Sequence, residues 1–293
     1  MAPRQRFLPG TLAAAIASRA ELALREGALV PIPTRAEVLE DGGIPFVVRV
    51  QAQLTRKRAA AAVQRAAGTN PFLPYEAALW VADVSDTHVC LLNKFNAVDR
   101  HVLLVTRAFE DQEEPLTPAD FAALWTCLEE TGGLGFFNAG EAAGASQRHK
   151  HLQVVPLPLG PGAAFPFEPR LAELASKEGV VAAPGLPFPL ALASLAAQGA
   201  RAPDETAAAL ADLYREMLDR TGVVPGRVPY NLLATRRWLW LVPRSRPEWR
   251  GIAVNALGFA GALLVPDEDA LARLRAAGPF AWLRAVTPGG EPV

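Results

Sequence analysis

Two of the four histidines in this 293-residue chain lie two residues apart, shortly after a run of small residues. Side chains along a β-strand alternate between its two faces. A strand over 149–155 would therefore place His149, His151 and Gln153 on one face and the intervening apolar residues on the other, in a core. Such a strand would present an imidazole group to a ligand.

The small residues upstream, Gly144-Ala145-Ser146, favour a turn whose backbone N–H groups can approach an anion closely. Amide donors beside a strand-borne histidine suit phosphoryl or nucleotidyl transfer, in which the protein must neutralise developing charge and supply a nucleophile. The spacing alone leaves two other interpretations open, namely a partly buried structural histidine and one half of a metal site.

The segment from Gly144 to Gln153 resembles the signature of the diadenosine tetraphosphate phosphorylases, also called ATP adenylyltransferases. They form part of the galactose-1-phosphate uridylyltransferase-like branch of the histidine-triad superfamily. Further similar segments follow in the family's order over roughly residues 45 to 265, namely Asn70–Pro74, Leu92–Phe95, His101–Thr106, Tyr230–Leu233 and Val254–Gly261. The uridylyltransferases usually carry proline between the two histidines, so Lys150 favours the phosphorylase group.

The resemblance implies a two-step transfer. His151 would attack the α-phosphorus of diadenosine tetraphosphate, ATP would leave, and inorganic phosphate would then take the adenylyl group to give ADP. Neutral imidazole suits this role if its other ring nitrogen donates to a fixed acceptor, either a nearby backbone carbonyl or His149. Gln153 stands where ordinary histidine-triad hydrolases have a third histidine, and it can donate to a phosphate oxygen.

The other candidate residues would bind the phosphates and the nucleotide. We expect donors from Asn138, Gly144, Ala145, Ser146, Gln147 and His149, and the resemblance adds Lys57, Asn93, Lys94 and Asn255. Arg148 and Lys150 are further local cations, although Lys150 should point away from His151 on the strand.

The expected ligands are a dinucleoside polyphosphate, ATP, ADP and inorganic phosphate. We expect no covalent cofactor, and the only metal expected is magnesium carried by the polyphosphate. One alternative is a nucleotide-sugar uridylyltransferase, against which Lys150 and the lack of Cys-x-x-Cys pairs count. A non-catalytic nucleotide-binding module is another. The preferred dinucleotide, the direction of flux, sulfate as acceptor, the metal requirement and the oligomeric state stay open.

The composition argues against other classes of protein. A formal net charge of −1 without a long basic run argues against nucleic-acid binding. The most apolar long window, residues 179–200, is interrupted by prolines and falls short of a bilayer span, and the first ten residues lack the apolar segment of a signal peptide. Cys90 and Cys127 lie in apolar surroundings, which predicts buried free thiols and a reducing cytoplasm.

Periodicity and turn residues predict the elements that position the site. Helices are expected over 11–27 with Thr11 as cap, from Thr117 to Gly132, over 168–177, from Asp204 as cap to Arg220, and from Asp267 as cap to Ala277. Strands are expected over 46–54, 149–155 and 187–195, and in two hairpins, 88–94 with 101–106 and 230–235 with 238–243. Residues 70–75 and 137–140 should form turns, and His88 and His101 should be surface or structural residues.

These elements predict an α+β fold of the histidine-triad type, with a mostly antiparallel sheet and flanking helices. The segment 93–107 has a distant echo at 230–244, which predicts two related halves, of which only the first has the nucleophile. The expected domains are 1–165 with the H-x-H-x-Q motif, a proline- and glycine-rich connector at 166–186, and 187–293 without catalytic histidines.

Overall fold

The computed structural model describes residues 6–51, 70–174, 179–182, 185–195 and 202–290. The strands are β1 (Thr34–Asp41), β2 (Ile44–Gln51), β3 (Trp80–Asp83), β4 (His88–Leu92), β5 (Val102–Thr106), β6 (Leu134–Ala139), β7 (His151–Val155), β8 (Val180–Ala182), β9 (Ala191–Ser194), β10 (Tyr230–Ala234), β11 (Trp238–Pro243), β12 (Glu248–Trp249), β13 (Ile252–Ala253) and β14 (Ala262–Val265). The helices are α1 (Leu12–Arg25), α3 (Pro118–Thr131), α4 (Glu168–Leu174), α5 (Pro203–Thr221), α6 (Glu268–Ala277) and α7 (Pro279–Ala285), with 3-10 turns η1 (Ala77–Leu79), η2 (Glu141–Ala143) and η3 (Ala256–Ala260).

One large sheet contains nine of these strands in the order β3-β4-β5-β7-β6-β10-β11-β9-β8. Every neighbouring pair in it is antiparallel. A second sheet, β1-β2-β14, combines an antiparallel pair with a parallel one. This architecture confirms the predicted α+β fold with a mostly antiparallel sheet, and both predicted hairpins and the motif strand β7 belong to the large sheet.

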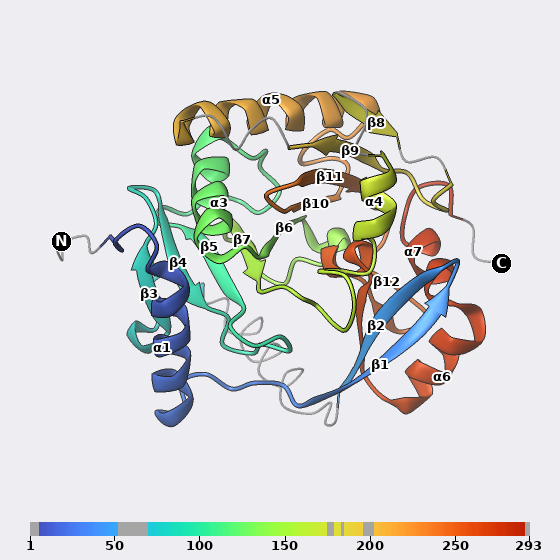
Figure 1. Cartoon of the computed structure of the whole chain (residues 1–293), viewed down its shortest axis with the longest axis horizontal. Coiled ribbons are helices and arrows are strands. Elements are labelled where there is room, and N and C mark those ends of the chain that lie inside the picture. The colour runs from blue at the N-terminus through green and yellow to red at the C-terminus, as the bar shows by residue number, and fades with distance from the viewer. Residues whose placement is uncertain (1–5, 52–69, 175–178, 183–184, 196–201, 291–293) are drawn as a thin grey trace.

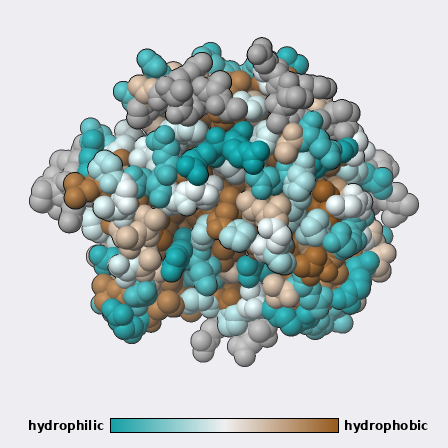
Figure 2. Space-filling view, in the orientation of Figure 1, coloured by the Kyte–Doolittle hydropathy of each residue, from teal (hydrophilic) through white to brown (hydrophobic). Residues whose placement is uncertain are grey.

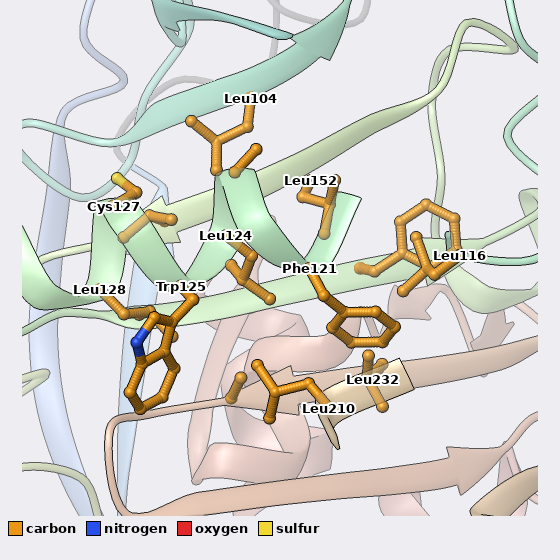
Figure 3. Packing of buried hydrophobic residues seen from close by; sticks show 14 of the residues in the cluster. Leu104, Leu116, Phe121, Leu124, Trp125, Cys127, Leu128, Leu152, Leu210 and Leu232 are labelled. Atoms are coloured by element: carbon orange, nitrogen blue, oxygen red, sulfur yellow. The ribbon is translucent and has the colours of Figure 1, made fainter. Parts of the chain in front are cut away.

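The two faces of the large sheet are covered by different parts of the chain. α1, α3 and α5 contact one face, and they lie along the left and the top of the view in Figure 1. Their apolar side chains pack on alternate residues of the strands, and Figure 3 shows Leu152 of β7 in this layer with Leu104, Leu124 and Phe121. On the opposite face, Trp238 and Trp240 of β11 belong to a second apolar cluster, which also contains residues of β2, β14, α6 and α7. Phe165 stacks on Trp240 there.

Local signals explain where α3 begins and ends. The Thr117 hydroxyl accepts from the N–H of Asp120, and the Asp120 carboxylate accepts from the N–H of Thr117, while Pro118 occupies the first turn. This reciprocal capping satisfies donors that the helix leaves free. Gly132 ends the helix in the left-handed conformation at φ 63°. The predicted helix is confirmed, and Phe121, Leu124, Trp125 and Leu128 are among its buried residues.

The predicted cap of α1 is wrong, because tertiary structure replaces it. The Thr11 side chain makes no cap hydrogen bond and donates instead to a backbone carbonyl. The Glu130 carboxylate of α3 accepts from the N–H groups of Gly10 and Leu12. A negative charge at this end of α1 also interacts favourably with the helix dipole. The buried face of α1 ends at Ala23. Leu24 also fits the helical spacing of the apolar residues, but it is exposed.

α4 begins at Glu168 as predicted, and its predicted end at 177 lies outside the described residues. At α5 the predicted cap is wrong. Pro203 takes the first position of α5, so Ala202 is the N-cap residue and Asp204 lies in the first turn, contrary to the prediction. Asp267 caps α6 as predicted, through the N–H of Ala270.

Several elements are absent from the sequence-based prediction. The turn expected at 137–140 is wrong, because β6 continues to Ala139 and pairs with β10. β1, β3, β8 and α7 were not predicted, since β1 has alternating partial exposure and the others are only 3 to 7 residues long. The two cysteines are confirmed as buried free thiols.

No helix in the described part of the chain combines the length and the apolar character that crossing a bilayer would require. The face of the molecule in Figure 2 mixes hydrophilic and hydrophobic residues over short distances.

Candidate active site

β7 presents its polar side chains on one face of the large sheet. It pairs with β5 and β6, with His151 opposite Val105 and Gln153 opposite both Leu103 and Phe136. His149 precedes the strand in an isolated bridge to Asp111. The rings of His149 and His151 both contact the ring of Phe72, at centroid distances of 5.6 and 5.4 Å. The alternation predicted for this segment is therefore correct.

The His151 ring is held in one tautomer. Its Nδ1 lies 2.8 Å from the backbone carbonyl of His149, so Nδ1 carries the proton and donates. Of the two acceptors considered from the sequence, the carbonyl takes this place. Burial lowers the pKa of His151 to about 4, and its side chain is only 4% exposed. The ring is consequently neutral at pH 7, with the lone pair on Nε2.

Gln112 holds β6 and β7 apart at His151. Its side-chain Nε2 donates to the carbonyls of Asn138 and His151, at 2.9 and 3.2 Å, and its Oε1 accepts from the His151 N–H at 2.8 Å. An amide side chain thus takes the place of direct strand pairing, and it is buried. Nothing in the local sequence around Gln112 indicates this role.

His149 is anchored on both ring nitrogens. Its Nε2 donates to the backbone carbonyls of Thr106 and Ala108, at 2.8 and 3.1 Å, and its Nδ1 accepts from the side-chain amide of Asn70 at 2.9 Å. Burial lowers the pKa of His149 as well. Both nitrogens are occupied, so His149 positions the chain next to His151.

A cavity of about 930 Å³ opens beside this face. Four predicted site residues belong to its wall, namely Ala145, Ser146, Gln147 and His149. His151 is not part of the wall and lies two residues further along the chain, against Phe72. Phe109, which is 55% exposed, contacts the His149 ring at 5.5 Å and also lines the cavity.

Gln153 and Asn93 are joined through His101. The Nε2 of His101 lies 2.9 Å from the Oε1 of Gln153, and its Nδ1 lies 3.1 Å from the side-chain amide of Asn93. If Asn93 donates to Nδ1, Nε2–H donates to Gln153, and the NH₂ group of Gln153 is free to face a ligand. His101, which was expected to be a surface or structural residue, is buried and contacts two predicted site residues.

Gly144 and Asn138 both contact the segment at Asn255 and Ala256. A side chain at Gly144, which has φ +96°, would approach the Cα and Cβ atoms of Asn255 to 3.0 Å. The Oδ1 of Asn138 accepts from the N–H of Ala256 at 3.0 Å and from Asn231 at 2.8 Å. Glycine is required at position 144 because both the backbone conformation and the close approach exclude a larger residue.

The predicted cations are already engaged with acids. Lys94 pairs with Glu76 at 2.6 Å, and exposed Arg148 pairs with Asp111 at 2.7 Å. Lys150 points away from the His151 face, as expected, and pairs with Glu110 at 2.7 Å. Lys57 lies outside the described residues. The cavity wall carries the carboxylates Asp111, Glu113, Glu114 and Glu141.

In the described ranges, no group of three or more histidine, cysteine, aspartate or glutamate side chains is arranged to hold a metal ion. The candidate site combines a neutral imidazole fixed by a backbone carbonyl with a cavity lined by a small-residue turn. These are features that enzymes transferring phosphoryl or nucleotidyl groups through histidine require.

Comparisons with known proteins identify the family. Residues 2–173 match the Ap4A phosphorylase N-terminal domain, and residues 184–288 match the ATP adenylyltransferase C-terminal domain. The chain belongs to the Ap4A phosphorylase and ATP adenylyltransferase family.

Two proteins of Saccharomyces cerevisiae are similar in sequence. Diadenosine 5',5'''-P1,P4-tetraphosphate phosphorylase 2 is 31% identical over 221 residues, which cover 63% of this chain and 64% of that protein. Protein APA1 is 26% identical over 298 residues, covering 91% and 90%. The crystal structure of yeast Ap4A phosphorylase Apa2 in complex with AMP has 25% identity and a TM-score of 0.77, covering 95% of this chain and 97% of that one.

Proposed function

We propose that this protein is a diadenosine tetraphosphate phosphorylase, which converts diadenosine tetraphosphate and inorganic phosphate to ATP and ADP through an adenylyl-histidine. The observation that carries this proposal is the His151 ring, neutral and held by the His149 carbonyl at 2.8 Å, in a member of this family. Support also comes from the name of the yeast relative and from the AMP complex of the similar yeast enzyme.

The first step makes an adenylyl-enzyme. The Nε2 of His151 forms a bond to the α-phosphorus, the bond from that phosphorus to the bridging oxygen breaks, and ATP leaves with the electron pair. The proton on Nδ1 stays directed at the His149 carbonyl, which stabilises the positive charge that develops on the ring. Because burial lowers the pKa of His151 to about 4, no proton has to leave before the attack at neutral pH.

The second step returns the free enzyme. An oxygen of inorganic phosphate bonds to the same phosphorus, the N–P bond breaks, ADP leaves, and neutral imidazole is restored. We assign the phosphate donors to Ser146, Gln147 and the NH₂ group of Gln153, which lie along the cavity and β7. The N–H of Ala145 donates to the Gly140 carbonyl at 3.1 Å, so Ala145 shapes the turn. Gly144, Asn138 and Asn255 support the adjoining turn, and Asn93 acts through His101. Lys94 would have to exchange Glu76 for a phosphate oxygen.

The test is to incubate purified protein with diadenosine tetraphosphate, with and without inorganic phosphate, and to resolve the products by chromatography. Phosphate-dependent formation of equal amounts of ATP and ADP supports the proposal. Products formed equally well without phosphate would indicate hydrolysis, and binding without turnover would indicate a nucleotide-binding module. Either result contradicts phosphorolysis.

The tetraphosphate is proposed to arrive as its magnesium complex. Asp111, Glu113, Glu114 and Glu141 line the cavity and would repel the bare polyanion, and a divalent ion on the phosphates reduces that repulsion. Chelation should lower the rate, and added magnesium should restore it. A rate that is insensitive to chelation contradicts this part of the proposal.

Two related halves are also proposed. The sheet order β4-β5-β7-β6-β10-β11-β9-β8 supports this. Read toward the centre of the sheet, one set runs β4, β5, β7, β6 and the other runs β8, β9, β11, β10. In both sets, the third and fourth strands along the chain stand in reversed order in the sheet. A helix lies at the same place along the chain in each set, since α3 connects β5 to β6 and α5 connects β9 to β10. The equivalence favoured by this order pairs β6–β7 with β10–β11, and so differs from the echo of 93–107 in 230–244. Separate expression of 1–165 and 187–293 would test the domain boundaries.

A cytoplasmic location is proposed on the two buried free thiols, Cys90 and Cys127, which suit a reducing compartment. Fractionation of cells with an antibody to the protein tests it, and enrichment outside the cytoplasm contradicts it.

A further inference from the structure

Arg244, which follows β11, is a buried cation that the proposed chemistry does not use. Its side chain is 1% exposed, and all five of its N–H groups are engaged. The acceptors are the Val286 carbonyl at 3.2 Å, the Asn231 Oδ1 at 2.6 Å, and the carbonyls of Ala143 at 3.2 Å, Arg246 at 2.9 Å and Val254 at 2.8 Å.

Every one of these acceptors is electrically neutral. In the part of the chain that the structure describes, no carboxylate forms an ion pair with Arg244, and burial lowers its pKa to about 9, which still leaves it protonated at neutral pH. Lys150, which is equally buried, lies 2.7 Å from Glu110 and 3.8 Å from Asp120. A buried charge without a counter-charge is costly, and an anionic ligand bound nearby would offset that cost.

The partners of Arg244 lie next to the proposed phosphate-binding turn. Ala143 directly precedes Gly144, and Val254 directly precedes Asn255. Gly144 and Asn255 are the two residues that approach so closely that a Cβ at position 144 would lie 3.0 Å from Asn255. Asn231 donates to Asn138 at 2.8 Å and to the Ala143 carbonyl at 2.8 Å, and thereby extends the same network to β6.

We propose that Arg244 is a positioning residue for the anion site. Its guanidinium group joins the 141–145 turn to the 254–256 segment, and its unpaired positive charge favours a nucleotide phosphate at the adjoining residues 145–147, which line the cavity. This inference rests on the proposed function, because it assigns a phosphate to those residues. A neutral side chain of similar length should therefore weaken binding of a charged nucleotide and leave the uncharged nucleoside nearly unaffected.

The experiment compares Arg244→Lys, which keeps the charge, with Arg244→Gln, which removes it and keeps a hydrogen-bonding amide. Calorimetry gives the dissociation constants for ADP and, as the uncharged probe, adenosine. We expect Arg244→Gln to weaken ADP binding at least about tenfold and adenosine binding less than about twofold, with a smaller loss for ADP in Arg244→Lys. Equal losses for ADP and adenosine, or equal losses in both variants, would overturn the inference.

A second variant covers the case in which Arg244→Gln does not fold. Asn231→Asp places a carboxylate next to the guanidinium and pairs its charge while Arg244 stays in place. It also removes the donations to Asn138 and Ala143, so adenosine is measured beside ADP and only a loss confined to ADP supports the inference. We expect it to weaken ADP binding selectively as well, and wild-type ADP affinity in this variant would overturn the inference. The matched control is Arg237→Gln, which removes an exposed arginine, paired with Glu168, just before β11, and should leave both affinities unchanged.

The two proposals fail in distinguishable ways. Wild-type protein that forms no ATP and ADP from diadenosine tetraphosphate and phosphate would contradict the proposed function. Wild-type turnover together with unselective losses in Arg244→Gln and Asn231→Asp would contradict the role of Arg244 alone.

Discussion

β7 and β11 occupy corresponding places in the sheet, each beside one strand of the central β6–β10 pair. On one sheet face β7 carries His151 and Gln153, whereas β11 carries Trp238 and Trp240 in an apolar core. The difference follows from what covers the face. The tryptophans of β11 lie in an apolar cluster with residues of β2, β14, α6 and α7, while a cavity opens beside His149, two residues before β7 begins. β7 thus presents polar side chains next to a cavity, whereas β11 contributes to an apolar core.

The largest effect should come from His151→Ala. Removing the nucleophile should lower kcat by at least about 10⁴-fold, since no adenylyl-enzyme can form, while nucleotide affinity stays measurable. Rapid-quench assays with labelled substrate and calorimetry with ADP give the two quantities. A rate within tenfold of wild type would mean that His151 is not the nucleophile. The proposed functional difference between β7 and β11 would then be wrong.

The corresponding change in β11 should act on stability instead. Trp240 is buried and stacks on Phe165 with ring centroids 5.6 Å apart, so Trp240→Ala should destabilise the fold by about 3–5 kcal/mol. The kcat of the protein that remains folded should stay within about threefold of wild type. Denaturant unfolding and active-site titration measure both values.

Trp240→Phe is the matched control for that variant. The indole N–H of Trp240 has no hydrogen-bond partner among the described residues, so its removal offsets part of the lost contact area. The change in stability should stay below about 1.5 kcal/mol. A loss as large as that of Trp240→Ala would mean that packing does not explain the role of β11.

Acid should destabilise the protein partly through His151. Its pKa is lowered to about 4 in the fold, so between pH 6.5 and 4 the unfolded chain binds more protons than the folded one, and stability falls as the pH falls. His151 should account for about 2.5 kcal/mol of the loss between pH 7.5 and 4.5. Chemical unfolding of wild type and His151→Asn at both values tests this, and an equal loss in both would contradict it.

The smallest effect should be a coupling between His101 and Gln153, which lie 2.9 Å apart. If His101 acts by orienting the amide of Gln153, His101→Ala should lower kcat/KM about tenfold in wild type and less than twofold in Gln153→Ala. His88→Asn, a buried histidine on the neighbouring strand, is the control, and its effect should be the same in both backgrounds. Additive losses for His101 and Gln153 would reduce His101 to a structural role.

Much of the fold could be predicted because its signals are local. The capping box of α3, the apolar runs of β4, β5, β10 and β11, and the alternation around His151 each depend on residues a few positions apart. The predictions failed where a distant group took over, as at α1, where Glu130 caps a helix more than 100 residues earlier in the chain. Short strands such as β8 carry too few residues for periodicity to be recognised.

The sequence by itself determined which side chains of β7 share a face, because strand geometry leaves no alternative once the strand forms. It also indicated the family, through motifs in a shared order. Only the tertiary structure decided that the His149 carbonyl holds the His151 ring, that Gln112 separates β6 from β7, and that His101 joins Asn93 to Gln153. Apart from the carbonyl, these contacts join residues on different elements, and hydrogen-bond partners of that kind are selected by how whole elements pack.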